Sequence, residues 1–178
     1  MTYWRGCQEI GNSEIAQAYL RRWVGRVSSV FEAGCGPGRN LTLFNGRVAG
    51  LDISHAFIRH ARMAMPQGEW HEEDGPSSTW LQSLPDEWVD LCFTRWHLAH
   101  IPPGPDKTKY IETLMRIGKT FLALEPTVQP GRSGVTPYVG DAITSWEDWA
   151  EYGLVLVETL EEDTQVWAKK GTVWTNES

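Results

Sequence analysis

The sequence has little of several features, and each shortage excludes a class of protein. Only three of the 178 residues are cysteines, and Cys7, Cys35 and Cys92 stand far apart, so we expect neither structural disulfides nor a metal centre. No apolar run approaches the length of a membrane span, and the polar start differs from a secretory signal, which predicts a cytoplasmic protein without a membrane partner. Positively charged residues are also few. Sixteen Lys and Arg against 23 Asp and Glu give a net charge of −7, which disfavours extended nucleic acid as a partner.

The chain instead contains an alternation of helix and strand patterns. An amphipathic helix follows the N-cap candidates Asn12-Ser13 and continues to Val24. Helices are then expected over residues 41–44, 54–65, 80–84, 107–117 and 145–152, and strands over residues 26–31, 47–53, 69–74, 88–94, 120–124, 154–158 and 164–169. Such alternation predicts a mostly parallel sheet with helices on both faces. The short connection between the final two strands predicts that the last strand is antiparallel.

The domain organisation is simple. The length and a hydrophobic content of 41% fit one domain, and no repeat or linker divides the chain. Residues 1–25 form an N-terminal helical segment ahead of a main unit over residues 26–178. The Pro/Gly-rich segment over residues 129–142 exceeds the usual length of a loop, and loops of that length are more often functional than filler.

A glycine-rich loop follows the first expected strand. Gly34, Gly36 and Gly38 stand at alternate positions, where glycine lets the chain turn sharply and lets bare backbone approach a ligand. Arg39 occupies the place where a dinucleotide-binding fingerprint needs another glycine, so the pattern disfavours NAD. Glu32, two residues before the loop, suits a ligand with a cationic amino-acid moiety.

Acidic residues at the next two strand ends extend this candidate site. Asp52 can accept two hydrogen bonds from ribose hydroxyls, and Asp74 stands within reach of an adenine amino group, although it also fits a turn before Gly75. The carboxyl ends of parallel strands meet at one edge of a sheet. Three successive strand ends therefore supply nucleoside-binding chemistry.

The segments Phe31–Leu41 and Gly50–Ser54 resemble the first two motifs of class I S-adenosylmethionine-dependent methyltransferases, and the similarity covers about residues 26–125. This resemblance implies a Rossmann-like α/β fold with a seven-stranded sheet, and S-adenosylmethionine as the cofactor. It makes residues 1–25 a lid over the cofactor and residues 26–178 the methyltransferase domain. The cofactor-binding residues that it implies are Glu32, Gly34, Gly36, Gly38, Asp52, Ile53, Asp74, Thr94 and Trp4.

Segments outside this core are similar to methylases associated with pseudaminic acid biosynthesis. The similar segments are Tyr3–Gly6, Glu9–Asn12, His97–Pro103, Leu124–Thr127 and Pro137–Asp141. That family usually carries Arg-Gly-His after the tyrosine of the last segment, where this chain has Val139-Gly140-Asp141. The resemblance favours a sugar or a sugar nucleotide as the methyl acceptor.

The acceptor side is expected near the fourth and fifth strand ends. A hydroxyl acceptor needs a general base, for which His100 is the first candidate and His97 the second, although both also fit structural positions after a buried strand. The candidate acceptor contacts are Tyr3, Trp96, Tyr138 and Asp141. No divalent metal is expected, because Thr94-Arg95-Trp96 offers no carboxylate at the end of the fourth strand.

These features predict a methyltransferase that acts on a small polar acceptor, because the core leaves no room for a separate recognition domain. Two alternatives stay open. One is a protein methyltransferase whose docking site includes the segment 129–142, and the other is a non-catalytic regulatory protein that binds S-adenosylmethionine. The sequence gives no sign of a homo-oligomer.

Overall fold

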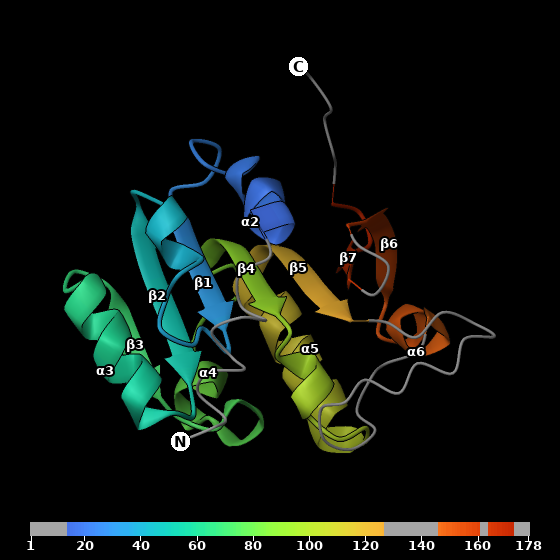
Figure 1. Cartoon of the computed structure of the whole chain (residues 1–178). Helices are drawn as coiled ribbons and strands as arrows, with labels where there is room; N and C mark the ends of the chain where they lie inside the picture. The colour runs from blue at the N-terminus through green and yellow to red at the C-terminus, as the bar shows by residue number, and fades with distance from the viewer. Residues whose placement is uncertain (1–13, 127–145, 161–163, 173–178) are drawn as a thin grey trace.

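The computed structural model describes residues 14–126, 146–160 and 164–172, which form a seven-stranded sheet with helices on both faces (Figure 1). The strand order is β3-β2-β1-β4-β5-β7-β6. The strands are β1 Ser29–Ala33, β2 Arg47–Asp52, β3 Glu69–Glu72, β4 Val89–Arg95, β5 Gly118–Pro126, β6 Leu154–Thr159 and β7 Thr164–Lys169.

The helices are short and alternate with the strands along the chain. The α-helices are α2 Glu14–Arg21, α3 His55–Ala64, α4 Thr79–Ser83, α5 Pro105–Ile117 and α6 Trp146–Glu151. Single 3₁₀ turns are η1 Leu41–Leu43, η2 Gly75–Ser77 and η3 Leu98–His100. Of the helices in the described residues, none combines the length and the hydropathy of a membrane-spanning segment.

The sheet is parallel except at its last strand. β1 pairs in parallel with β2 and β4, β3 pairs in parallel with β2, and β5 with β4. β7 lies between β5 and β6 and runs antiparallel to both. This arrangement confirms the predicted mixed sheet with an antiparallel last strand. It also opens the carboxyl ends of β1 to β5 along one edge, where a doubly wound fold binds its ligands.

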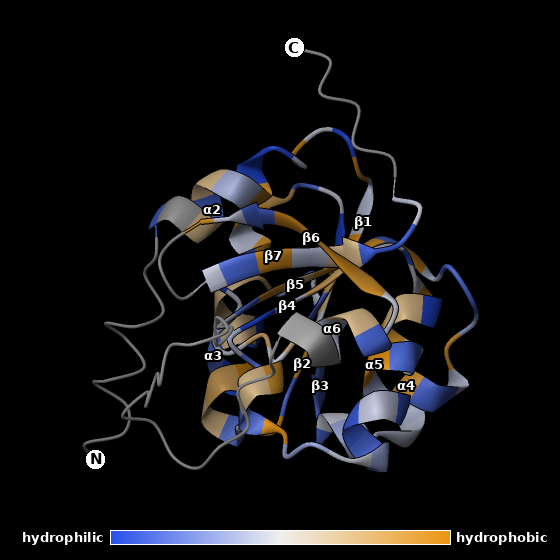
Figure 2. Cartoon of the chain, turned by 90° about the vertical axis from the view of Figure 1, so that its right-hand side faces the viewer, coloured by the Kyte–Doolittle hydropathy of each residue, from blue (hydrophilic) through white to orange (hydrophobic). Residues whose placement is uncertain are grey.

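Two apolar layers fill the space between the sheet and its helices, and apolar residues concentrate along the strands and the inward sides of the helices (Figure 2). One layer includes Leu81 of α4, Leu114 of α5 and Trp149 of α6. The other includes Leu20 of α2 and Ile58 of α3. Ser54 caps α3 by accepting a hydrogen bond from the Phe57 N–H, as its place before an apolar run predicted.

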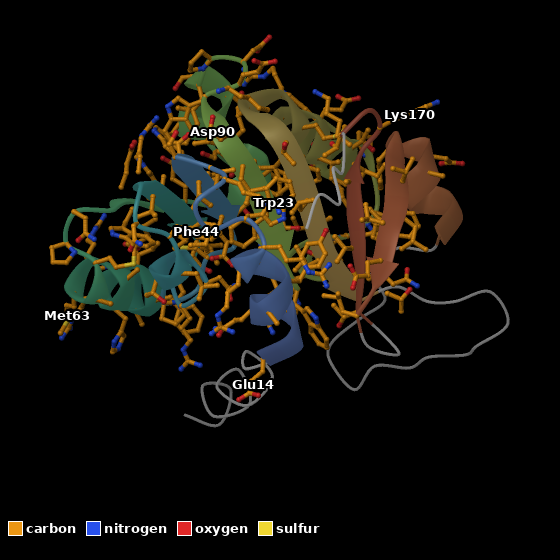
Figure 3. The ribbon with its side chains drawn as sticks, turned by 90° about the horizontal axis from the view of Figure 1, so that it is seen from above. Glu14, Trp23, Phe44, Met63, Asp90 and Lys170 are labelled. Carbon is orange, nitrogen blue, oxygen red and sulfur yellow. The ribbon has the colours of Figure 1, made fainter. Side chains whose placement is uncertain are left out.

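The helical part of the predicted N-terminal lid packs against the sheet. The buried side chains of α2 are Ala16, Tyr19 and Leu20. Trp23 follows α2 and packs against the same apolar layer as Phe44 (Figure 3). Arg22 forms a bidentate pair with Glu158 of β6 at 2.5 and 3.2 Å. Residues 1–13 lie outside the described part of the chain, so the closure of a lid over the cofactor stays a prediction.

The first strand begins later than its sequence pattern predicted. Residues 26–31 were expected to be extended, whereas β1 covers Ser29–Ala33. The helical region continues past α2 in turns, in which the Arg26 N–H donates to the Trp23 carbonyl. Pairing with β2 and β4 then keeps the chain extended up to Ala33.

A single carboxylate fastens the amino ends of β1 and β4. Asp90 Oδ2 accepts hydrogen bonds from the backbone N–H and the hydroxyl of both Ser28 and Ser29 at 2.6 to 3.1 Å. Lys119 Nζ lies 2.7 Å from Asp90 Oδ1. Lys119 and then Ser28 hold the pKa of Asp90 well below its usual range. An ion pair and hydrogen bonds therefore hold the amino ends of these strands together, and the candidate site lies at their carboxyl ends.

Candidate functional site

The glycine loop turns away from β1 in a conformation that favours glycine at three positions. The φ angles of Gly34, Gly36 and Gly38 are 70°, 52° and 81°, which is the left-handed region. The backbone N–H groups of Gly34 and Cys35 both donate to the Leu51 carbonyl, at 2.8 and 3.0 Å. The loop is thus tied to the neighbouring strand β2.

The three glycines differ in what surrounds them. A Cβ added to Gly36 would have no heavy atom within 4 Å, so a ligand can approach the backbone there. A Cβ on Gly38 would lie 2.9 Å from the Trp70 ring, and a Cβ on Gly34 would lie 2.3 Å from the His97 ring. Gly34 and Gly38 are therefore required by packing within the protein, and their predicted contacts with a cofactor stay predictions.

Asp52 is oriented by the loop that it faces. Its Oδ2 accepts a hydrogen bond from the Gly36 N–H at 2.9 Å, and its Oδ1 accepts one from the Ser54 N–H at 2.8 Å. Burial raises the pKa of Asp52, whereas the Ser54 and Gly36 N–H groups lower it. The next side chain, Ile53, is 71% exposed. The carboxyl end of β2 thus combines a fixed carboxylate with an exposed apolar group, which fits a ribose and the flat face of a base.

A buried polar pair lies behind the glycine loop. Glu32 is 1% exposed, and its Oε1 accepts a hydrogen bond from Asn40 Nδ2 at 2.6 Å. Burial raises the pKa of Glu32 to about 8, although the Asn40 hydrogen bond lowers it. Within the described residues, Glu32 Oε2 and Asn40 Oδ1 have no hydrogen-bond partner. Two such acceptor atoms fit a ligand that brings a donor, such as the ammonium group of an amino-acid moiety.

Asp74 lies beyond the end of β3, at an exposed position before η2. Its Oδ2 accepts a hydrogen bond from the Ser77 hydroxyl at 2.8 Å. β3 ends at Glu72, so the strand is shorter than predicted and Asp74 belongs to the loop. Its carboxylate keeps free acceptor capacity toward solvent. The predicted contact with an adenine amino group stays a prediction.

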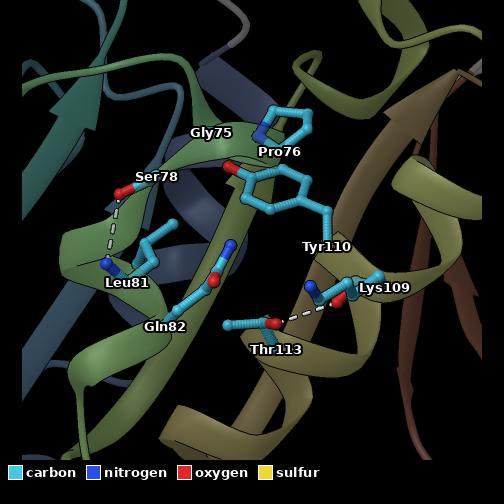
Figure 4. Close-up of a pocket in the computed structure, with 8 residues that line it drawn as sticks. All are labelled: Gly75, Pro76, Ser78, Leu81, Gln82, Lys109, Tyr110 and Thr113. Carbon is cyan, nitrogen blue, oxygen red and sulfur yellow. Dashed lines mark hydrogen bonds between the residues drawn. The ribbon is translucent and has the colours of Figure 1, made fainter.

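A small cavity lies beside this loop, between α4 and α5 (Figure 4). Gly75, Gln82, Tyr110 and Thr113 are among its lining residues, and its volume is about 10 Å³. That volume accommodates about one water molecule. The cavity is therefore too small to receive a methyl acceptor.

Glu125, a fully buried residue of β5, accepts hydrogen bonds from the segment after β4. Glu125 Oε1 accepts hydrogen bonds from the Thr94 hydroxyl at 2.7 Å and from the His97 and Leu98 N–H groups at 3.1 and 3.2 Å. Its Oε2 accepts one from the Ala99 N–H at 3.3 Å. This carboxylate therefore sets the path of the chain into η3.

Thr94 does not present its side chain to the site. The residue is 0% exposed, and its hydroxyl is occupied by Glu125. β4 continues to Arg95, one residue beyond the predicted strand end, which leaves Thr94 inside the sheet. The predicted role of Thr94 in cofactor binding stays a prediction. Glu125 was not a predicted site residue, and the sequence signals for it are its acidic side chain after an apolar strand and its place in the similar segment Leu124–Thr127.

The two histidines predicted as catalytic have different surroundings. His97 Nε2 lies 3.0 Å from the Tyr110 hydroxyl, and burial lowers the pKa of His97 to about 4, so the ring is neutral. His100 ends η3 and is exposed. Because its side chain is exposed in the segment after β4, His100 stays the better candidate for a general base.

Trp96 adopts a strained backbone conformation at the carboxyl end of β4. Its φ is 50°, and its indole Nε1 donates a hydrogen bond to the Thr164 hydroxyl at 3.2 Å. The indole thereby links the end of β4 to the start of β7. Strain of this kind collects at functional sites, and it fits the predicted place of Trp96 beside the acceptor.

The other predicted contacts lie outside the described residues. These are Tyr3 and Trp4 in the N-terminal segment, and Tyr138 and Asp141 in the segment after β5. Their roles toward the cofactor and the acceptor stay predictions.

Comparisons with known proteins identify the family. Residues 31–120 match the family model of the methyltransferase domain. The trans-aconitate 2-methyltransferase of Azoarcus sp. (strain BH72) is 35% identical over 81 residues, which are 43% of this chain and 30% of that protein. A probable methyltransferase of Aspergillus luteorubrus, ltbC, is 26% identical over 137 residues, which are 68% of this chain and 48% of that protein. The chain thus spans less than half of the length of either curated relative.

Solved structures share the fold at low sequence identity. The PH0226 protein from Pyrococcus horikoshii OT3 has a TM-score of 0.69 at 15% identity, with 87% of each chain covered. S-adenosylmethionine-bound CalS10, an amino pentose methyltransferase from Micromonospora echinaspora, has a TM-score of 0.66 at 15% identity, with 94% of this chain and 95% of that chain covered. These likenesses confirm the Rossmann-like methyltransferase fold.

The comparisons support the broad family of the chain and leave its subfamily undetermined. The family match confirms the class I methyltransferase resemblance, whereas the similarity to the pseudaminic acid methylases stays a prediction. The open space at Gly36, the fixed Asp52 carboxylate and the orphaned Glu32 oxygen fit S-adenosylmethionine, the predicted cofactor. On this evidence the chain belongs to the methyltransferase domain family.

Proposed function

We propose that this protein transfers the methyl group of S-adenosylmethionine to a small polar acceptor, such as a sugar or a sugar nucleotide. The observation that carries the proposal is the arrangement of Gly36 and Asp52. The open face of Gly36 lets a ligand reach the backbone, and the Gly36 N–H fixes the carboxylate of Asp52 beside it. Both lie at the carboxyl edge of the parallel strands, where this fold binds ligands.

When bound, S-adenosylmethionine supplies a methyl group attached to a positively charged sulfur. The chain has to align the acceptor in line with the breaking bond, at about 3 Å, and keep water away. Asp52 can accept hydrogen bonds from the ribose hydroxyls, and Ile53 can cover the base. His100 can take the proton of a hydroxyl acceptor, because it is exposed at the end of η3.

The named relatives support a small acceptor. By their names, two act on trans-aconitate and on an amino pentose, which are both small polar molecules. The described residues hold one continuous sheet with its covering helices, so they leave little room for a separate recognition domain. A small carboxylic acid is therefore included beside sugars in the range of acceptors to be tested.

Calorimetry with S-adenosylmethionine and S-adenosylhomocysteine tests the cofactor site. We expect Asp52→Ala to weaken both ligands about ten- to hundredfold, because it removes charge-assisted hydrogen bonds worth about 1.5 to 3 kcal/mol. Asp86→Ala is the matched control, since the Asp86 side chain is 77% exposed and pairs only with Arg116 among the described residues. Wild-type protein that binds neither ligand would refute the proposed function.

A screen of acceptors tests the reaction itself. Trans-aconitate, amino sugars, sugar nucleotides, small amines, peptides and intact proteins are each incubated with the enzyme and the cofactor, with and without a chelator. Mass spectrometry then detects a gain of one methyl group. Methylation of intact protein alone would favour the protein methyltransferase. Tight cofactor binding without turnover on any acceptor would favour the regulatory protein.

A further inference from the structure

Two loops that border the cofactor site are joined by one pair of side chains. His97 comes from the segment after β4, and Tyr110 comes from α5. His97 Nε2 and the Tyr110 hydroxyl are 3.0 Å apart, and the two rings meet edge to face with centroids 5.7 Å apart. Tyr110 is 2% exposed and His97 is partly buried, so the contact between them is largely shielded from solvent.

The His97 ring packs against the glycine loop. A Cβ on Gly34 would lie 2.3 Å from both Cγ and Nδ1 of the His97 ring, so the ring lies directly against the Gly34 backbone. Glu125 fixes the other end of this contact by accepting the His97 N–H. The position of the glycine loop therefore depends on where the imidazole lies.

Tyr110 makes the equivalent contact with the loop after β3. A Cβ on Gly75 would lie 2.3 Å from the Tyr110 hydroxyl oxygen and 2.5 Å from Cζ. The phenol points from α5 toward the backbone of Gly75 (Figure 4). Gly75 directly follows Asp74, the predicted adenine contact, so Tyr110 fixes the backbone beside that residue.

We propose that His97 and Tyr110 are positioning residues that set the distance between the glycine loop and the Asp74–Gly75 loop, and so preorganise both ends of the S-adenosylmethionine site. This inference rests on the proposed function, because it presumes that one cofactor contacts both loops. The neutral state of His97 supports it, since an uncharged ring can stay buried against Gly34. A ligand that contacts two loops binds more tightly when their separation is already set.

Tyr110→Phe tests the proposal, because it removes the hydroxyl and keeps the ring. We expect S-adenosylhomocysteine to bind about tenfold more weakly, since the two loops lose their common support. Adenine lacks both the ribose and the amino-acid portion, so among the proposed contacts it reaches the Asp74–Gly75 loop alone, and its affinity should change by less than about twofold. A variant that merely weakens the fold would change both affinities alike.

Thr113→Val is the matched control on the same helix. Thr113 lies one turn after Tyr110, lines the same small cavity and donates a hydrogen bond only to the Lys109 carbonyl among the described residues. Its loss should leave the affinities for both ligands unchanged. Gly75→Ala tests the same contact from the loop after β3, since the new methyl group would displace the Tyr110 phenol. It should reproduce the selective loss of S-adenosylhomocysteine affinity.

Amide hydrogen exchange supplies a readout that needs no ligand. Tyr110→Phe should speed exchange at Gly34 and Gly36 and in the turn after Gly75, whereas Thr113→Val should not. Unchanged S-adenosylhomocysteine affinity, equal losses for both ligands, or unchanged exchange in Tyr110→Phe would each overturn the inference while the proposed function stands. If wild-type protein binds no S-adenosylhomocysteine, the proposed function itself fails and this inference with it.

Discussion

Replacing Glu32 by glutamine should make the protein more stable at alkaline pH and weaken its hold on the cofactor. The folded protein raises the pKa of this carboxyl from 4.5 to about 8, chiefly through burial. The folded state therefore prefers the protonated form. The contribution of Glu32 to the free energy of unfolding is most favourable below pH 4.5 and declines as the pH rises toward 8, because the folded chain then has to hold a buried charge.

The size of this decline follows from the shift. A rise from 4.5 to about 8 corresponds to about 5 kcal/mol between the two ends of this pH range. Glutamine is neutral at every pH and has nearly the same shape. Its oxygen can keep the Asn40 Nδ2 hydrogen bond, and its amide can donate to Asn40 Oδ1, which lacks a partner among the described residues.

Urea unfolding between pH 5 and pH 9 checks this reasoning. The free energy of unfolding of Glu32→Gln relative to wild type should increase steadily with pH and level off above pH 8. Calorimetry on the same samples should show weaker S-adenosylmethionine binding, since a bound ammonium group favours the ionised carboxylate of Glu32, which glutamine cannot form. A difference in stability that stays constant from pH 5 to pH 9 would show that Glu32 is not a buried carboxyl with a raised pKa.

Three further outcomes are expected. Gly36→Ala should weaken S-adenosylmethionine binding in calorimetry and lower the melting temperature less than Gly38→Ala. Both variants strain a left-handed backbone, but only the Gly38 methyl group would lie 2.9 Å from Trp70, and equal melting temperatures would contradict this distinction. Asp90→Asn should lower the free energy of unfolding by about 1.5 to 3 kcal/mol at neutral pH. The difference from wild type should shrink as the pH falls below 4, because the carboxyl of the unfolded chain is protonated there while the folded carboxylate still resists protonation. His100→Gln should slow turnover about 10²- to 10⁴-fold at constant cofactor affinity, and an unchanged rate would exclude it as the base.

Much of the fold could be predicted from the sequence because its determinants are local. Ser54 caps α3 through a contact within its own segment, which does not depend on what the helix packs against. The spacing of the apolar residues distinguishes strands from helices. The Gly36–Asp52 contact could also be predicted, since Asp52 ends β2 and Gly36 lies in the loop after β1, and the two strands pair in parallel.

The sequence could not show contacts that depend on packing between distant segments. Glu125 reaches η3 only because β5 lies beside β4, and Tyr110 meets His97 only because α5 returns across the sheet. The hydrogen bond of the Thr94 hydroxyl was likewise beyond the sequence, because its acceptor, Glu125, comes from the adjacent strand β5.

The place of β7 in the sheet has a consequence for synthesis. β6 is the outer strand and pairs with β7, which emerges from the ribosome after it. Until Thr164–Lys169 has been synthesised, one edge of β5 has no pairing strand. Phe121 and Leu122 of β5 are fully buried in the finished fold. An unpaired apolar edge invites aggregation. A nascent chain that pauses before β7 would therefore be a target for chaperones, although six of its seven strands were already made.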